Sequence, residues 1–361
     1  MHARTAFISE TPMAHTIQIA DHDIAFAADA SRSVLDNALA AGYEIPYSCR
    51  SGICGSCRGK VVAGEVRGGS GVGVLGDDER REGHVLLCQA QACSDLTIAV
   101  RDIEKRNPDA TKSIKAKVHK LTQAAPDVTI VHLRFPAGTK VRFKAGQYLH
   151  ARLEDGTVRH YSMANPPQQN DGVELHIRHV AGGRFTAHLA GEMQVGHYLD
   201  LTLPFGDFTV RDATDKPMIL LASGTGFAPV KAIVEDAIKR KTTRPMTLYW
   251  GARKAADVYL ADLPAKWAQK YPWFRFVPVL SDSDSDGGGA ALEGCRTGFV
   301  HQAVLDDHAS LAAHEVYACG SPVMIQAARQ AFVDDRGLPR DAFFCDAFVP
   351  AVMPDEVFTP A

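Results

Sequence analysis

The stretch CRSGICGSC, residues 49–57, decides the fold of the N-terminal part of this chain. Its thiols have the spacing C-x4-C-x2-C, and a fourth cysteine follows later in HVLLCQAQAC. This pattern is typical of four thiolates that hold a 2Fe-2S cluster. The small residues between the thiols let the loop wrap closely and turn backbone N–H groups toward anionic sulfides. The spacing therefore predicts four cluster ligands: Cys49, Cys54, Cys57 and Cys88.

Three other interpretations compete with a 2Fe-2S cluster that has Cys88 as its fourth ligand. A structural zinc site usually takes its thiols in two close pairs, whereas Cys88 stands alone in the sequence. Inert buried thiols would not need this spacing. Cys93 could replace Cys88 as the fourth ligand, but Cys88 lies in the apolar run VLLC, where a strand can fix its position. We therefore favour a 2Fe-2S cluster with Cys88 as a ligand.

The segments around the cysteines predict a small domain with a hairpin and a helix. HTIQIADHDIAF, residues 15–26, alternates apolar and polar side chains around a polar turn, which favours a hairpin. SVLDNALAAG favours a helix that Ser33 caps and Gly42 ends. This order resembles the plant-type ferredoxin domain, a β-grasp fold, over residues 13–103. Because the domain begins at Met13, we expect residues 1–12 to be either a disordered extension or the product of an upstream start codon.

Composition and charge exclude several classes of protein. The 361 residues are enough for two or three domains, and the net charge of -3 gives no footprint for nucleic acid. No apolar stretch is long enough to span a membrane, and MHARTAFISETPMAH lacks the apolar core of a signal peptide. Eight cysteines, unevenly spread, do not suit a disulfide scaffold. We expect a cytoplasmic protein with no nucleic-acid or membrane partner.

The middle of the chain changes to strand periodicity. DIEKRNPDATK is polar and carries a proline, so residues 104–112 are predicted to be a linker. Apolar and polar residues then alternate in three segments that turn residues separate: IKAKVHKL, VTIVHLRF and QYLHARL. This pattern predicts an antiparallel β-barrel over residues 113–212.

One predicted barrel strand, RHYSMAN, carries candidate ligand-binding side chains. Alternation places Arg159, Tyr161 and Met163 on one face and His160 and Ser162 on the other. An arginine beside an aromatic ring suits a ligand with both a phosphate and a flat ring system. An exposed arginine beside a half-buried tyrosine would give the same pattern.

A second motif follows in HIRHVAGGRFTAHL, where a strand runs through two glycines into a helix start, a natural nest for a diphosphate. In this order, and behind a ferredoxin, the two motifs resemble the FAD-binding barrel of the ferredoxin-NADP reductase superfamily, whose signature is R-x-Y-S. The resemblance implies these FAD-binding residues: Arg159, Tyr161, Ser162, Met163, His176, Arg178, Gly182, Gly183, Arg184 and Thr186.

The C-terminal third predicts a nucleotide-binding domain over residues 213–361. KPMILLASGTGFAPVKAIVEDAIKR has the order strand, glycine turn and amphipathic helix, and the turn places backbone N–H groups where a dinucleotide diphosphate can bind. A single G-x-G is a weak signal. Further strands that alternate with helices indicate a doubly wound parallel α/β sheet. The candidate nucleotide-binding residues of the turn are Gly224, Thr225, Gly226 and Pro229.

The same resemblance implies a catalytic region at the ends of two later strands. CGSP matches a Cys-Gly-x-Pro that lies beside the nicotinamide, which implies roles for Cys319 and Gly320. FFCDAF matches the final strand of the family, near the flavin, which implies roles for Asp346 and Phe348. A buried thiol before a helix, and a phenylalanine that belongs to the core, are the plainer interpretations.

The choice between NADH and NADPH stays open at this point. Arg253 follows the strand MTLYWGA, where it could meet a ribose 2′-phosphate. Asp257 is close enough in sequence to favour a free 2′-hydroxyl instead, so we lean slightly to NADH.

The order of the three domains resembles the reductase components of bacterial aromatic-ring oxygenases. The stretches IPYSCRSG, SMANPP, HIRHVAGGRF, GTGFAP and WGAR look most like those of terephthalate dioxygenase reductases. A nicotinamide gives up two electrons together and a 2Fe-2S cluster accepts one at a time, so FAD converts between them. The resemblance implies an NAD(P)H-dependent reductase that supplies a terminal oxygenase of the Rieske non-haem iron type.

Two kinds of alternative remain. Reductases of diiron monooxygenases and of the dehydratases of dideoxysugar synthesis share this domain plan and differ in the protein that they supply. The alternative from another class is a binding module that zinc stabilises. It would be fused to a degenerate nucleotide-binding fold without catalytic turnover.

Overall fold

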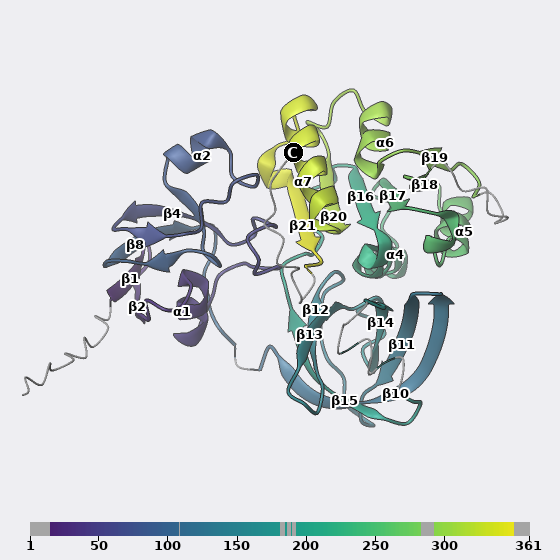
Figure 1. Cartoon of the computed structure of the whole chain (residues 1–361), viewed down its shortest axis with the longest axis horizontal. Coiled ribbons are helices and arrows are strands. Elements are labelled where there is room, and N and C mark those ends of the chain that lie inside the picture. Colours follow the sequence, from purple (N-terminus) through teal and green to yellow (C-terminus); the bar gives the residue numbers. More distant parts are fainter. Residues whose placement is uncertain are drawn as a thin grey trace, which may run out of the picture. The chain divides into compact units, whose positions relative to one another are not determined.

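The computed structural model describes residues 15–107, 109–180, 185, 189, 193–282 and 292–349. The chain divides into two compact units, with the boundary between residues 107 and 108 (Figure 1). The predicted extension over residues 1–12 lies outside the described residues. Among the described residues, none of the helices has the length and hydrophobicity that a membrane span requires.

The first unit contains a mixed five-stranded sheet in the order β2-β1-β8-β4-β6. The predicted hairpin is present as the antiparallel pair β1–β2, and β8 runs parallel to β1. This sheet, with α1 packed into the same core, confirms the β-grasp prediction. The elements are β1 (His15–Ile19), β2 (Ile24–Ala28), α1 (Val34–Ala40), β4 (Arg58–Ala63), α2 (Asp77–Arg81), β6 (His84–Leu86) and β8 (Leu96–Val100).

Helix α1 forms where its capping residue and apolar face predict it. Ser33 is the N-cap, and its hydroxyl accepts a hydrogen bond from the backbone N–H of Asp36 at 3.1 Å. Val34 and Leu35 are fully buried in the core of the unit. The helix ends at Ala40, just before Gly42 takes a positive φ of 83°. The chain then forms the short strand β3 (Tyr43–Glu44) before it enters the cysteine loop.

The first unit extends beyond the predicted boundary at residue 103. Ile103 is buried in its core, and the short strand β9 (Glu104–Lys105) pairs antiparallel with β3 (Tyr43–Glu44). Strand β9 is exposed and carries only charged side chains. For this reason the composition of the segment resembled that of a linker. A second small pair joins β5 (Val66–Arg67) to β7 (Gln91–Ala92).

The second unit begins with the predicted antiparallel barrel. Its six strands follow the order β13-β12-β15-β10-β11-β14, and every neighbouring pair is antiparallel. Inward-facing apolar side chains of all six strands form one core. The strands are β10 (Lys112–Ala125), β11 (Val128–Arg134), β12 (Tyr148–Arg152), β13 (Val158–Ser162), β14 (Gly172–Arg178) and β15 (Tyr198–Phe205).

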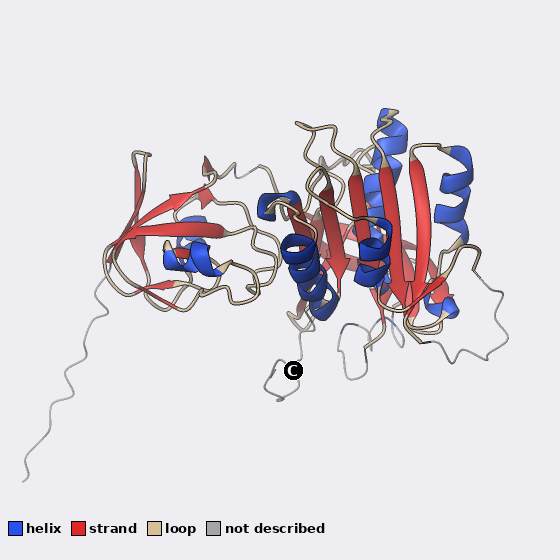
Figure 2. Cartoon of the chain, turned by 90° about the horizontal axis from the view of Figure 1, so that it is seen from above, coloured by secondary structure: helices blue, strands red, loops and turns tan. Residues whose placement is uncertain are grey.

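A six-stranded parallel sheet completes the second unit, in the order β19-β18-β17-β16-β20-β21. Helices cover both faces of this sheet (Figure 2), which explains the continuous apolar run in β16. The predicted doubly wound α/β fold is confirmed. Its elements are β16 (Met218–Ser223), α4 (Phe227–Arg240), β17 (Met246–Ala252), α5 (Asp262–Lys270), β18 (Phe274–Leu280), β19 (Arg296–Thr297), α6 (Val300–Asp307), β20 (Glu315–Gly320), α7 (Pro322–Gln330) and β21 (Phe343–Ala347).

Candidate cofactor and electron-transfer sites

The four predicted cluster ligands lie together in the first unit. Cys49, Cys54 and Cys57 come from the loop between β3 and β4, and Cys88 follows β6. Backbone N–H groups point at the sulfur of Cys49: those of Ser51 and Cys54 donate to it at 3.5 and 3.3 Å. This loop geometry agrees with the expectation that the small residues turn N–H donors toward anionic sulfur.

The thiols are arranged as two pairs. Cys49 and Cys54 are hydrogen-bonded to each other, and Cys57 is hydrogen-bonded to Cys88. The hydrogen bond with Cys54, helped by donors on Ser51, outweighs burial and lowers the pKa of Cys49 to about 5. A thiolate is therefore favoured at Cys49 near neutral pH.

The arrangement of the four thiols in two pairs fits a 2Fe-2S cluster, which takes four thiolates divided between its two irons. Cys93 is exposed, and its thiol contacts the Gln91 carbonyl at 3.9 Å, which favours Cys88 as the fourth ligand.

The predicted flavin-binding strand is β13. Tyr161 packs against Phe185 with ring centroids 4.9 Å apart, and Met163 is fully buried in the barrel core. On the opposite side His160 stacks on His150 at 4.2 Å, as the alternation of the strand requires. Arg159 is half-buried, and its guanidinium donates to the carbonyl of Val158 at 2.8 Å.

The hydroxyl of Ser162 supplies a test of whether a cofactor fits beside β13. It is buried, and among the described residues it has no hydrogen-bond partner. An orphaned buried hydroxyl is costly unless a ligand or water completes it, so the position suits the polar edge of a flavin ring. The residues of the predicted glycine nest lie outside the described residues: Gly182, Gly183, Arg184 and Thr186.

The predicted nucleotide turn is a short 3-10 helix over Gly224–Gly226, between β16 and α4. Helix α4 continues directly from this turn without a side-chain cap, and the N–H of Phe227 donates to the carbonyls of Gly224 and Thr225. Thr225 is half-buried in the turn, whereas Pro229 is buried inside α4 and supplies no polar group. The indole N–H of Trp250, on β17, donates to the Gly224 carbonyl at 3.1 Å and so fixes the turn to this strand.

The predicted catalytic cysteine lies beside this turn. A Cβ at Gly226 would come within 2.1 Å of the Cys319 carbonyl oxygen, so the two backbones touch. Gly320 has a φ of 131°, and a Cβ at this position would lie 2.3 Å from the Ser223 hydroxyl oxygen. Cys319 and Asp346 are register partners on the parallel strands β20 and β21. Burial and the nearby Asp346 raise the pKa of Cys319 well above its usual value, so it stays a neutral thiol.

Phe348 follows β21, and its N–H donates to the Gly320 carbonyl at 2.8 Å. Its ring is half-buried and packs on the core of the parallel sheet. The structure therefore brings Cys319, Gly320, Asp346 and Phe348 together at the carboxyl ends of two strands, next to the Gly224–Gly226 turn. Ligands of open α/β sheets bind at this edge. Their catalytic roles stay predictions.

Arg178 connects the barrel to the nucleotide turn. It ends β14, and its guanidinium lies 3.3 Å from where a Cβ of Gly224 would be. Asp127 pairs with Nη1 at 3.5 Å, but Nε and Nη2 are buried without a hydrogen-bond partner among the described residues. Unsatisfied guanidinium donors beside a glycine turn fit a cofactor phosphate.

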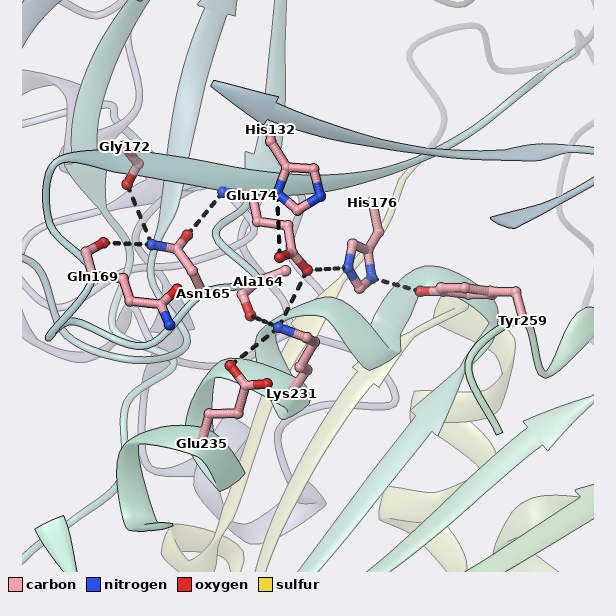
Figure 3. Close-up of polar contacts among 10 residues, drawn as sticks. All are labelled: His132, Ala164, Asn165, Gln169, Gly172, Glu174, His176, Lys231, Glu235 and Tyr259. Carbon is pink, nitrogen blue, oxygen red and sulfur yellow. Dashed lines mark hydrogen bonds and ion pairs between the residues drawn. The ribbon is translucent and has the colours of Figure 1, made fainter. Parts of the chain in front are cut away.

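His176 was predicted to bind the cofactor, but the structure occupies both of its ring nitrogens. Nε2 lies 2.8 Å from the Glu174 carboxylate, and Nδ1 lies 2.8 Å from the Tyr259 hydroxyl (Figure 3). The side chain is fully buried. Both ring nitrogens of His176 therefore contact other residues of the protein.

Sequence reasoning missed the partners of His176. Glu174 alternates with His176 on one strand, and Lys231 interrupts the apolar face of α4. Both features were visible signals of buried charge. At the far end of β17, Arg253 is exposed, and Asp257 accepts the backbone N–H of Lys254 at 3.2 Å. That capping contact weakens the argument that Asp257 selects NADH.

The fold and these sites define the class of the protein: an electron-transfer oxidoreductase built from a ferredoxin-like domain, a flavin barrel and a nucleotide-binding sheet. Family models match in the same order. They are a 2Fe-2S iron-sulfur cluster binding domain over residues 17–93, an oxidoreductase FAD-binding domain over 115–210 and an oxidoreductase NAD-binding domain over 220–330. The cofactors of this chain are thus FAD, a 2Fe-2S cluster and a nicotinamide nucleotide.

Known proteins resemble the chain over nearly all of its length. Reductase component 2 of terephthalate 1,2-dioxygenase from a Comamonas species is 41% identical, with 93% of this chain and 98% of that protein covered. The CDP-6-deoxy-L-threo-D-glycero-4-hexulose-3-dehydrase reductase of Yersinia pseudotuberculosis is 37% identical over 94% and 100% of the two chains. The crystal structure of the Amycolatopsis cytochrome P450 reductase GcoB has 31% identity and a TM-score of 0.71, covering 94% and 100%.

The chain belongs to the family of reductases that join a plant-type 2Fe-2S ferredoxin domain to FAD- and NAD-binding domains, which includes the reductase components of bacterial oxygenases.

Proposed function

We propose that this protein is the reductase component of an aromatic-ring dioxygenase of the terephthalate type. It takes electrons from NADH or NADPH and delivers them to a terminal oxygenase with a Rieske centre and non-haem iron. The single observation that carries the proposal is the 41% identity with the Comamonas reductase, which extends over 98% of that protein and all three domains. The aromatic substrate would bind to the oxygenase and not to this chain.

When bound, FAD supplies the exchange between a two-electron donor and a one-electron acceptor. The residues of this chain hold the reactants for that exchange. Arg178 and the Gly224–Gly226 turn present donors for phosphates, and Ser162 offers a hydroxyl beside β13. The two thiol pairs of the first unit would bind the 2Fe-2S cluster, from which electrons pass to the acceptor protein. Preorganised donors of this kind need no rearrangement when a cofactor binds.

The second candidate is a reductase for a sugar dehydratase, which the 37% identity with the Yersinia protein favours. The test is reconstitution with one acceptor at a time. The purified protein and NADH are mixed with the oxygenase component of a terephthalate dioxygenase, and product formation is compared with NADH oxidation. We expect tight coupling with the oxygenase. Coupled turnover with the dehydrase alone would refute the proposal and establish the second candidate.

A further inference from the structure

A buried lysine joins the nucleotide-binding helix to the flavin barrel. Lys231 lies near the start of α4, and only 8% of its side chain is exposed. Its ammonium group lies 3.2 Å from the Glu174 carboxylate, 3.1 Å from Glu235 and 3.2 Å from the Ala164 carbonyl (Figure 3). The ammonium group donates hydrogen bonds to the Glu235 carboxylate and the Ala164 carbonyl, and it forms an ion pair with the Glu174 carboxylate. A buried charge is tolerated only when it is paired in this way.

Two of the three acceptors belong to the barrel, at the strands that carry the candidate cofactor residues. Ala164 follows Ser162 at the end of β13, and Glu174 lies on β14, which ends at Arg178. The backbone N–H of Ala164 also donates to the Glu174 carbonyl at 2.8 Å. Lys231 therefore fixes α4 against both strands at one point.

Glu174 links Lys231 to a second pair of residues, His176 and Tyr259. Burial alone would raise its pKa, but the hydrogen bond with His176 and the charge of Lys231 outweigh burial and lower the pKa to about 2. Burial lowers the pKa of His176, so its ring is neutral. Nε2–H then donates to the carboxylate, which leaves Nδ1 to accept the Tyr259 hydroxyl.

Tyr259 completes the connection to the turn. Its ring packs edge-on against Trp250, with ring centroids 5.2 Å apart. The Trp250 indole donates to the Gly224 carbonyl. The turn is thus held from two directions: by α4 through Lys231, and by Trp250 through Tyr259 and His176. Both connections meet at the Glu174 carboxylate.

We propose that Lys231, with Glu174, His176 and Tyr259, positions the Gly224–Gly226 turn over the flavin barrel and so sets the alignment for hydride delivery from the nicotinamide. The inference rests on the proposed function, and it assigns to these residues a positioning role without contact with either cofactor. Reacting atoms must be held within a narrow distance, and an error of about 1 Å can reduce a rate about 100-fold.

The test compares full-length Lys231→Met with the wild type and with Lys239→Met, a control at an exposed lysine in the last turn of the same helix. Anaerobic stopped-flow absorbance measures the rate of FAD reduction by NADH, and the FAD content is measured separately. We expect Lys231→Met to retain its FAD. The rate of FAD reduction by NADH should fall at least about tenfold. The control should match the wild type, and Lys231→Arg, which keeps the charge, should recover part of the rate.

Tyr259→Phe keeps the ring and removes only the hydroxyl. This variant tests the positioning role even if Lys231→Met does not fold. A slower reduction of FAD with unchanged FAD content supports the proposal. Rates within about twofold of the wild type in every folded variant would overturn it. No acceptor protein takes part in this measurement, so a failure here is distinct from a failure of the proposed oxygenase role.

Discussion

The main-chain oxygen of Cys319 fills the space beside Gly226 that any side chain would need, because a Cβ there would lie 2.1 Å from it. Gly226→Ala must therefore push the nucleotide turn away from β20. Overpacking of this kind costs about 1–3 kcal/mol. We expect a lower melting temperature and a higher KM for NADH, with unchanged FAD content. A variant with the wild-type KM would show that the turn does not bind the nucleotide.

Cys54→Ser tests the cluster. Cys54 belongs to one of the two thiol pairs, and its loss should remove the cluster and abolish reduction of cytochrome c. FAD reduction by NADH should continue, because that step uses residues of the second unit. Cys93→Ser is the matched control, since this thiol is exposed, and it should behave as the wild type. If Cys54→Ser stops both reactions equally, the cluster has a structural role.

Arg159→Ala tests the flavin side. Nη1 of its half-buried guanidinium donates to the neighbouring Val158 carbonyl, and a guanidinium has five N–H donors, so others can serve a diphosphate. We expect the purified variant to contain less FAD than the wild type, measured by flavin absorbance against protein. Arg152→Ala, at an exposed arginine on the adjacent strand β12, is the control. Equal FAD occupancy in both variants would remove Arg159 from the binding site.

The ion pair of Glu174 predicts a pH dependence of stability. Its pKa falls from 4.5 to about 2 on folding, so its contribution is complete above about pH 4.5 and is lost as the pH falls toward 2. The shift corresponds to about 3 kcal/mol. The free energy of unfolding of Glu174→Gln should therefore approach that of the wild type in this acid range, and the difference should stay constant between about pH 5 and 8.

Urea unfolding followed by tryptophan fluorescence can measure this effect, because Trp250, Trp267 and Trp273 all lie in the parallel-sheet part of the second unit, next to α4 or β18. Lys239→Met serves again as the control for a change of surface charge. A difference between Glu174→Gln and the wild type that does not change down to about pH 3 would mean that Glu174 is not held as a carboxylate.

Local features of the sequence predicted local features of the fold. The Ser33 cap and the spacing of Cys49, Cys54 and Cys57 depend on residues close together in the chain. The doubly wound sheet followed from regular alternation of strands and helices. The edge of the first unit was harder to place, because Ile103 is one apolar residue within a charged segment.

The supporting network could not be predicted from the sequence. Lys231 contacts Ala164 and Glu174, which are distant in the chain and meet only when the barrel packs against α4. Sequence alternation could identify His176 as inward-facing, but not that Tyr259 would occupy its second nitrogen. Buried polar groups depend on partners that only the tertiary structure supplies.

Electron transfer through all three sites can be tested with an absorption spectrum of the purified protein, before and after anaerobic addition of NADH and, separately, of NADPH. We expect flavin bands with iron–sulfur shoulders, both of which bleach with at least one of the two nucleotides. The nucleotide that acts faster is then the physiological donor. A colourless protein, or one whose flavin bleaches while the iron–sulfur absorbance is absent, would contradict electron transfer through all three sites.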